Sequence, residues 1–185
     1  MEYLKENSIA KRVAVMLRTA KISILNYSDE MFENLENEEG EEASYDEKYE
    51  AKASVGHEVE ECFSSNGLRW MSNKDIGLVA FSDKPDPLWY KNVVGATLYL
   101  ERFDDRNKHV YDFDIAVKKD AQGGTVGHML VSASIQDARS LDCDVIKLYV
   151  VNPLMHTMLT KMFGFKGSEP DTRGGNFQSY LYLNL

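Results

Sequence analysis

Apolar residues follow a helical period in the first third of the chain and gather into short runs after it. This pattern predicts a helix over residues 3–25, whose end at Ile22–Leu25 could instead begin a short strand. A second helix is predicted from about Asp46 to Phe63, because Ser64-Ser-Asn-Gly67 is a typical C-terminal stop. The N-terminal part of the chain is therefore expected to be mainly helical.

From Ile76 onward, β-branched and aromatic residues form runs bounded by turn residues, and these runs predict strands. The expected strands are Ile76–Phe81, Val93–Leu100, Val110–Val117, Val145–Val151 and Phe177–Leu183, with a hairpin at 104–108. One helix runs from Gly127 towards Ser140, and a short one follows from Pro153 to Gly164. In the short helix four apolar residues are expected to face inward, namely Leu154, Met158, Leu159 and Met162.

This order of elements predicts a mixed α/β fold. An antiparallel meander feeds a strand–helix–strand crossover, and further helices flank a central, mostly antiparallel sheet. A length of 185 residues fits one domain, so residues 1–185 are expected to form a single domain.

The net charge of −9 is concentrated in one segment. Residues 29–50 contain 11 of the 30 acidic residues and one of the 21 basic ones, which leaves 19 acidic and 20 basic residues elsewhere. Like charges with little to bury predict an exposed, mobile loop at about 29–46. The loop is either a solvated insertion or a surface that attracts a cationic acceptor. Because no basic face is visible, no nucleic-acid partner is expected.

Several classes of protein and site lack support in the sequence. No apolar run approaches the roughly 20 residues that span a bilayer, and the N-terminus does not resemble a secretory signal. A cytoplasmic protein without a membrane partner is therefore expected. Cys62 and Cys143 are expected to be buried free thiols. No set of His, Cys and carboxylate residues has metal-site spacing, so no metal is predicted.

A glycine-rich turn, Gln122-Gly-Gly-Thr-Val-Gly127, lies between a predicted strand and a predicted helix. A helix that starts directly after such a turn directs unpaired backbone N–H groups at one spot, which suits a phosphate. The run is not a P-loop, since no lysine follows Gly127, and it is not a GxGxxG dinucleotide fingerprint. The alternative is a turn that needs glycine for its geometry alone.

At this turn the chain resembles the GNAT family of acyl-CoA-dependent N-acyltransferases. The cofactor motif of that family is (Q/R)xxGx(G/A) at a strand end; Gln122 and Gly127 match its ends, and Thr125 replaces the usual first glycine. Three further segments resemble the family in order and spacing: Asn92–Tyr99, Asp114–Val117 and Leu159–Phe165. The resemblance covers about residues 76–185 and implies a GNAT-like fold.

The resemblance implies acetyl-CoA as co-substrate. Main-chain groups of Ile115, Ala116 and Val117 would hold its pantetheine arm and thioester carbonyl. Its pyrophosphate would lie on the N–H groups of the turn, namely those of Gln122, Gly123, Gly124, Thr125, Val126 and Gly127, with His128 following. Asn152 is either a further cofactor contact or the N-cap of the helix that begins at Pro153.

Two acidic residues of one predicted strand are the candidate catalytic groups. Asp112 and Asp114 alternate along the strand, so both side chains leave the same face, next to the implied thioester site. Paired carboxylates raise each other's proton affinity, which suits a base that accepts a proton from an amine. The alternative is ordinary solvent-facing alternation. Glu101 and Tyr149 are weaker candidates, and Thr160 stands where the family often has a tyrosine general acid.

The resemblance thus predicts an acyltransferase that moves an acetyl group from acetyl-CoA to an amine by direct attack. The acceptor is expected to be an amine-bearing small molecule or protein, and the antiparallel C-terminal strand could support a homodimer. The alternative is a catalytically inactive GNAT-fold binding or assembly module, which Thr125 and Thr160 favour. A third interpretation is an acidic mimic of nucleic acid that uses residues 29–50.

Overall fold

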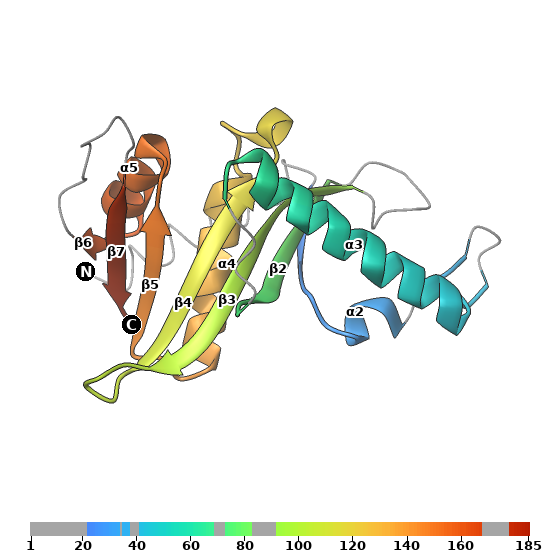
Figure 1. Cartoon of the computed structure of the whole chain (residues 1–185), viewed down its shortest axis with the longest axis horizontal. Coiled ribbons are helices and arrows are strands. Elements are labelled where there is room, and N and C mark those ends of the chain that lie inside the picture. The colour runs from blue at the N-terminus through green and yellow to red at the C-terminus, as the bar shows by residue number, and fades with distance from the viewer. Residues whose placement is uncertain (1–21, 34, 38–40, 69–72, 83–91, 168–177) are drawn as a thin grey trace, which may run out of the picture. The chain divides into compact units, whose positions relative to one another are not determined.

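The structure is a computed structural model that describes residues 22–33, 35–37, 41–68, 73–82, 92–167 and 178–185. The elements along the chain (Figure 1) are β1 (Ile22–Asn26), α2 (Glu30–Glu33), α3 (Tyr45–Ser65), β2 (Asp75–Ser82), β3 (Val93–Phe103), β4 (His109–Val117), the 3₁₀ turn η2 (Lys119–Ala121), α4 (Val126–Ser140), β5 (Val145–Val150), α5 (Pro153–Met162), β6 (Lys166–Gly167) and β7 (Ser179–Asn184). Most of the helix predicted over residues 3–25, and the start of the last predicted strand, lie outside the described residues.

The strands are hydrogen-bonded in the order β1-β2-β3-β4-β5-β7-β6. β1 pairs antiparallel with β2, and β7 pairs antiparallel with both β5 and β6. β4 and β5 pair in parallel and are connected by α4, which is the predicted strand–helix–strand crossover. The predicted mixed α/β fold is therefore confirmed, with the short strand β6 as an addition that the sequence did not indicate.

The chain divides into two compact units, and each is described by itself. The first consists of residues 1–70, 76–96 and 115–133, and the second of residues 71–75, 97–114 and 134–185. Formation of one domain by residues 1–185 stays a prediction. No helix in the described ranges is long and apolar enough to cross a membrane.

In the first unit, α3 begins at a capping box and buries one stripe of apolar residues. The Ser44 hydroxyl accepts a hydrogen bond from the Glu47 N–H (3.3 Å), and the Glu47 carboxylate accepts one from the Ser44 N–H (2.7 Å). Val55, Val59 and Cys62 are fully buried at the spacing that defines one helix face.

α4 approaches β3 closely at Gly95. A Cβ atom at this position would lie 3.0 Å from the Ala116 carbonyl oxygen and 3.1 Å from the side chains of Val126 and Leu130. Glycine therefore lets the first turns of α4 pack against the sheet. The buried cluster formed in this way consists of Leu78, Ala80, Val117, Val126 and Leu130.

In the second unit, β3 and β4 are joined by the hairpin predicted at 104–108. The Asp104 carboxylate accepts hydrogen bonds from the N–H groups of Arg106 (2.9 Å) and Lys108 (3.1 Å). Asn107 has a left-handed φ of 57°, a conformation that asparagine tolerates better than most residues. The turn residues of the sequence thus account for the hairpin.

The inward face expected for α5 is wrong for two of its four residues. Leu159 is fully buried, whereas Leu154 is 81% exposed and Met162 is 63% exposed. Five residues along a helix correspond to about 500°, so Leu154 lies about 140° away from Leu159. Met162 is the last residue of α5, and Phe165, 3% exposed, takes the buried position after the turn at Gly164.

Part of the acidic segment has regular structure. It contains α2 and an isolated antiparallel bridge between Glu36 and Glu42. Lys48, the single basic residue of the segment, donates to the Glu42 carboxylate (2.7 Å) and to the Glu33 carbonyl (2.8 Å). The segment at 29–46 is thus not a continuous loop, and its mobility stays a prediction.

Both cysteines are buried free thiols, as the sequence predicted. Burial raises the pKa of Cys62 from 9.0 to about 11. The pKa of Cys143 is also raised to about 11, first by burial and then by neighbouring carboxylates. Because the thiol pKa is higher in the folded state than in the unfolded state, the folded protein keeps the thiol proton at a pH at which the unfolded chain releases it.

We expect the free energy of unfolding to fall as the pH rises from about 9 to about 11. In that interval folded Cys62 keeps a proton that the unfolded chain releases, so its contribution is complete below pH 9 and lost through pH 11. Urea unfolding midpoints at about pH 8 and about pH 10.5 measure the change. Cys62→Ala should reduce the pH dependence, and equal slopes for variant and wild type would contradict the assignment.

Candidate functional site

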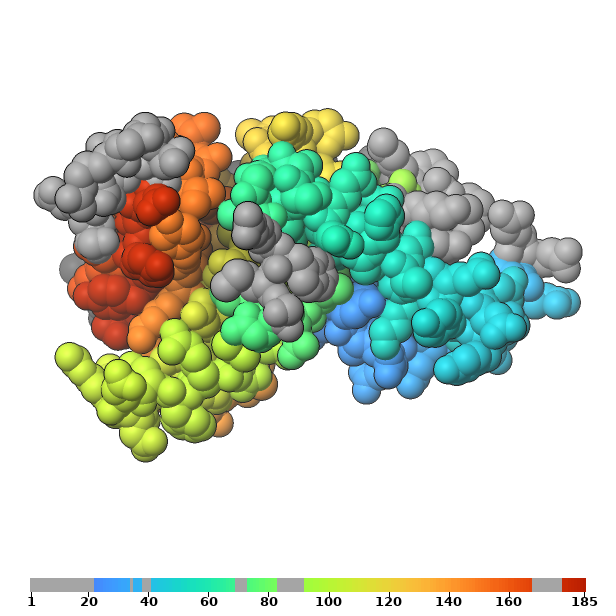
Figure 2. Space-filling model, in the orientation of Figure 1, coloured from blue at the N-terminus to red at the C-terminus, as the bar shows by residue number. Residues whose placement is uncertain are grey.

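The predicted glycine turn connects the end of β4 to α4 in the first unit. The Lys118 N–H donates to the Val94 carbonyl (2.9 Å), which holds the chain on the sheet up to that point. η2 follows, and Gly123 then takes a left-handed φ of 79° that glycine adopts without strain. α4 begins at Val126, so the turn leads directly into a helix N-terminus. Figure 2 shows this turn, coloured yellow, at the surface.

The turn contains a run of backbone N–H groups that lack an acceptor. Some have no hydrogen-bond partner among the described residues, and the others lie in the first turn of α4, where no intrahelical acceptor exists. These groups belong to Gly123, Gly124, Thr125, Val126 and Gly127. A backbone bond at the start of the helix runs from the Met129 N–H to the Thr125 carbonyl (3.0 Å). No described atom lies within 4 Å of a Cβ position on Gly123. The turn therefore presents open donors to an anion.

Gln122 anchors the turn through its side chain. Its Nε2 donates to the Asn66 Oδ1 (2.8 Å) and to the Val117 carbonyl (3.0 Å), and its N–H donates to the Lys119 carbonyl (3.4 Å). Asn66, the C-cap of α3, donates from Nδ2 to the same Val117 carbonyl (3.0 Å) and to the Cys62 carbonyl (2.7 Å). In the sequence, Asn66 is visible only as part of a helix stop, because nothing local indicates a partner 56 residues away.

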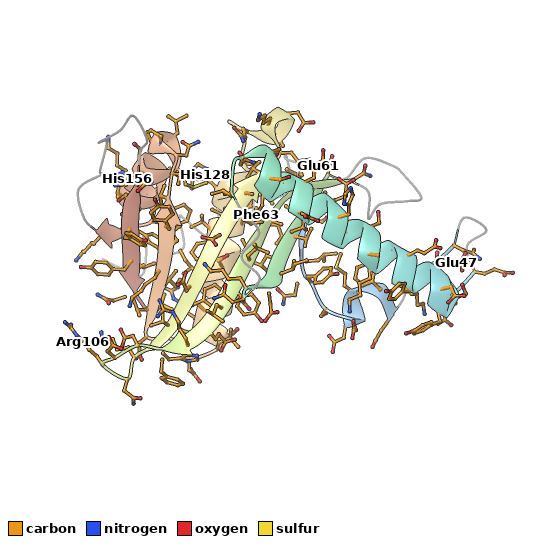
Figure 3. The ribbon with its side chains drawn as sticks, in the orientation of Figure 1. Glu47, Glu61, Phe63, Arg106, His128 and His156 are labelled. Carbon is orange, nitrogen blue, oxygen red and sulfur yellow. The ribbon has the colours of Figure 1, made fainter. Side chains whose placement is uncertain are left out.

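Lys118 forms a second link between the turn and α3. Its Nζ pairs with the Glu58 carboxylate and lies 3.9 Å from the Glu61 carboxylate. Glu61 is labelled on α3 in Figure 3. Together with the Gln122 and Asn66 contacts, this ion pair fixes the start of the turn from one side.

β4 and β5 pair over only part of their length. The ladder joins Val110 to Val145, Tyr111 to Ile146 and Asp112 to Lys147, although β4 continues to Val117 and β5 to Val150. Within the second unit, Phe113 and Asp114 therefore have no ladder partner on β5. The parallel ladder therefore ends before either strand does.

Asp112 and Asp114 lie on one face of β4, as predicted, and share a cation. The Lys74 Nζ lies 2.9 Å from a carboxylate oxygen of each. Arg102 adds a second contact to Asp112 at 3.2 Å. The Lys74 side chain is only 7% exposed, and the two carboxylates are 24% and 21% exposed.

These two cations change the interpretation of the carboxylate pair. Asp112 and Asp114 do not act on each other alone, because the cluster holds two positive and two negative groups. The repulsion between the two carboxylates is therefore offset by their cationic partners. Lys74 lies 38 residues from Asp112 in the chain and belongs to no recognisable motif.

The two weaker candidates lie in different surroundings. Glu101 contacts His109 Nε2 at 3.2 Å, so it belongs to the face of the β3–β4 hairpin opposite Asp112. Tyr149 packs against Tyr180 with 4.7 Å between ring centroids. It lies two residues from Lys147, the ladder partner of Asp112, and so shares the face of the carboxylate cluster.

A cavity of about 510 Å³ lies beside the hairpin in the second unit. Four cationic side chains line it, and two carboxylates, Asp104 and Asp105, accompany them. The cationic residues are Arg102, Arg106, Lys108 and Lys147. Arg106 projects from the hairpin tip (Figure 3). The excess of positive charge suits an anionic group.

Two side chains of α5 are engaged by the helix itself. The Asn152 Oδ1 accepts hydrogen bonds from the N–H groups of Leu154 (2.8 Å) and Met155 (3.3 Å), which confirms the N-cap interpretation. A cofactor contact from Asn152 would have to use Nδ2. The Thr160 hydroxyl donates to the His156 carbonyl (2.9 Å), so its proton is directed into the helix.

Several solved structures have a similar fold. The structure of the NatC complex bound to Gag peptide and CoA matches with a TM-score of 0.53 and 14% identity, covering 89% of this chain and 99% of the other. The structure of yncA, a putative acetyltransferase from Salmonella typhimurium with acetyl-CoA, matches with a TM-score of 0.51 and 15% identity. The match covers 89% of this chain and 94% of the other. The structure of a GNAT-family acetyltransferase from Streptococcus pneumoniae matches with a TM-score of 0.52 and 13% identity, covering 89% of this chain and 99% of the other. No curated protein matches the sequence.

The sequence itself matches one family model, that of the acetyltransferase (GNAT) family. The match extends over residues 28–165, which is 138 of the 185 residues. It includes α3, the carboxylate cluster, the glycine turn and α5. A match of this length decides the question that the shorter motifs raised, and the chain belongs to the GNAT family of acetyltransferases.

Proposed function

We propose that the protein is an N-acyltransferase that moves an acetyl group from acetyl-CoA to an amine. The observation that carries this proposal is the run of open N–H groups from Gly123 to Gly127 at the start of α4. CoA contains a diphosphate, and convergent N–H groups at a helix N-terminus suit such an anion. Two structures of similar fold that contain CoA or acetyl-CoA support the same ligand.

The main chain would bind most of the cofactor. Ile115, Ala116 and Val117 would hold the pantetheine arm and the thioester carbonyl, and the open N–H groups would hold the diphosphate. One charge at an exposed helix N-terminus gains only about 0.3–1 kcal/mol, so several donors must act together. Gln122 would position the turn, and further contacts would come from His128 and from the Nδ2 of Asn152.

The reaction would proceed by direct attack of the neutral amine nitrogen on the thioester carbonyl. The C–N bond forms, the C–S bond breaks, and the departing CoA thiolate takes up the second N–H proton, so that the products are the amide and CoA thiol. Deprotonation of an alkylamine with a pKa of about 10.4 costs roughly 4–5 kcal/mol at pH 7. Asp112 and Asp114 would bind the ammonium group and receive its proton, while Lys74 and Arg102 hold the carboxylates in place. A thiol with a pKa of about 8.5 is a moderate leaving group, so Thr160 is not required as an acid.

The acceptor would be an amine-bearing small molecule or protein. The NatC structure of similar fold is bound to a peptide, which supports a polypeptide acceptor. The cationic cavity beside Arg102 suits an acceptor that also carries a carboxylate or phosphate group. Amines with and without such a group therefore belong in any substrate panel.

Isothermal titration of the full chain with acetyl-CoA and with CoA tests the proposal. We expect a dissociation constant in the micromolar range, which corresponds to about −8 kcal/mol. Absence of binding at millimolar ligand would contradict the proposal that the protein is an acyltransferase. Thiol release across the amine panel tests transfer, and binding without transfer to any amine would favour the inactive binding module instead.

A further inference from the structure

Three residues with metal-binding side chains meet in the second unit, on the face of the hairpin opposite the carboxylate cluster. They are Glu101 on β3, His109 on β4 and Cys143 in the turn between α4 and β5. Their ligand atoms all lie within 4.8 Å of one another, and the Glu101 Oε2 and His109 Nε2 are 3.2 Å apart. No local spacing predicts this cluster, because it combines three separate elements.

The main chain holds these residues in place. The His109 N–H donates to the Asp144 carboxylate (2.8 Å), and the Asp144 N–H donates to the His109 carbonyl (2.8 Å). These two bonds connect His109 to the residue that follows Cys143. The Cys143 N–H donates to the Ala138 carbonyl (3.0 Å), and the His109 ring stacks on Phe103 at 5.0 Å between centroids. These contacts fix the main chain at His109 and Cys143 and orient the His109 ring.

The electrostatic surroundings of the cluster are negative. Besides burial, four carboxylates raise the pKa of the Cys143 thiol, and they are Glu101, Asp137, Asp144 and Asp142. Among the described residues, no lysine or arginine forms an ion pair with any of these four. The Tyr111 hydroxyl donates to Asp137 (2.8 Å) and is the neutral neighbour on β4. Such a site favours a divalent cation over a neutral or anionic ligand.

We infer that Glu101, His109 and Cys143 form a binding site for a divalent ion of the zinc type. Thiolate and imidazole ligands select zinc over calcium and magnesium, which prefer oxygen. Tetrahedral bonds of about 2.0–2.3 Å place ligand atoms about 3.4 Å apart. The three ligand atoms already lie within 4.8 Å of one another. Water completes the fourth position. The ion would tie the β3–β4 hairpin to the α4–β5 turn, whether or not the protein transfers acyl groups.

Binding requires that Cys143 lose its proton. The Cys143 S–H proton passes to solvent as the S–metal bond forms, while His109 binds through Nε2 in its neutral form.

Cobalt titration of the full chain, treated beforehand with a chelator, tests the inference. Co²⁺ is expected to produce a near-ultraviolet thiolate-to-cobalt charge-transfer band with one-to-one stoichiometry, and Zn²⁺ to displace it. Cys143→Ser should abolish the band, while Cys62→Ser should keep it, since Cys62 is the other buried free thiol. His109→Ala should weaken Co²⁺ binding by more than about 100-fold. Loss of a residue that only supports a metal ligand costs up to about 100-fold in affinity, and loss of a ligand itself should cost more. The exposed His57, changed to Ala, is its control.

Thermal unfolding of the wild type gives a second readout that does not need a folded variant. Zn²⁺ should raise the melting temperature and Mg²⁺ should not, because an ion that binds only the folded state stabilises it. The inference is overturned if the wild type gives no charge-transfer band, or if Cys62→Ser removes the band and Cys143→Ser does not. An equal effect of Zn²⁺ and Mg²⁺ on melting would overturn it as well.

Discussion

A Gly127→Glu variant will bind acetyl-CoA at least about 100-fold more weakly than the wild type. Gly127 lies in the first turn of α4, among the N–H groups proposed to hold the diphosphate. A glutamate there places a carboxylate against a doubly charged anion, and like-charge contacts of this kind cost several kcal/mol. Isothermal titration with acetyl-CoA measures the loss, with circular dichroism to show that the variant is folded.

Two further variants separate charge from side-chain size. Gln136→Glu adds the same negative charge to an exposed position of the same helix, so it should leave cofactor affinity almost unchanged. Gly127→Gln adds a side chain of similar volume without charge. Its affinity for acetyl-CoA should lie between that of Gly127→Glu and that of the wild type. Wild-type affinity in a folded Gly127→Glu protein would show that no diphosphate lies on this turn.

Lys74→Met will lower the free energy of unfolding by about 2–3 kcal/mol. The change leaves Asp112 and Asp114 close together with Arg102 as their remaining cation, on Asp112 only. Removal of one partner from a buried ion pair costs roughly 3–5 kcal/mol, and we expect less because both carboxylates keep some solvent contact. Urea unfolding at neutral pH gives the difference directly.

The matched control for this prediction is Lys147→Met. Lys147 is 37% exposed and pairs with a single carboxylate, Asp104, at 3.3 Å, so its loss should cost less than about 1 kcal/mol. Addition of Asp112→Asn and Asp114→Asn to Lys74→Met should recover much of the lost stability, because the uncompensated charges are then gone. Equal costs for Lys74→Met and Lys147→Met would show that the shared cation has no special role.

Local signals predicted most of the elements. The helix stop at Ser64–Gly67, the alternation in β4 and the turn residues of the 104–108 hairpin all act within a few residues, so they are visible without tertiary structure. The glycine turn is another case, because its φ requirement and the helix after it are encoded side by side. The inward face predicted for α5 was wrong at Leu154, because that residue was assigned to the core for being apolar and not for its position in the helical period.

The partners of the site residues could not be predicted. Lys74 reaches the carboxylates, and Asn66 reaches the turn, across sheet and helix contacts whose register a single sequence does not specify. The same limit applies to Cys143, which meets His109 only after α4 has returned the chain to the sheet. The sequence therefore indicated candidate site residues, and the fold decided which charges surround them.

The contact between Gln122 and Asn66 has a thermodynamic consequence. Because the C-cap of α3 and the glycine turn share the Val117 carbonyl as a common acceptor, the two segments order or loosen together. A molecule that immobilises the turn should then slow amide hydrogen exchange in the last turn of α3. A substitution that frays that helix end should in turn weaken the molecule's binding, at most by the factor by which binding slows the exchange.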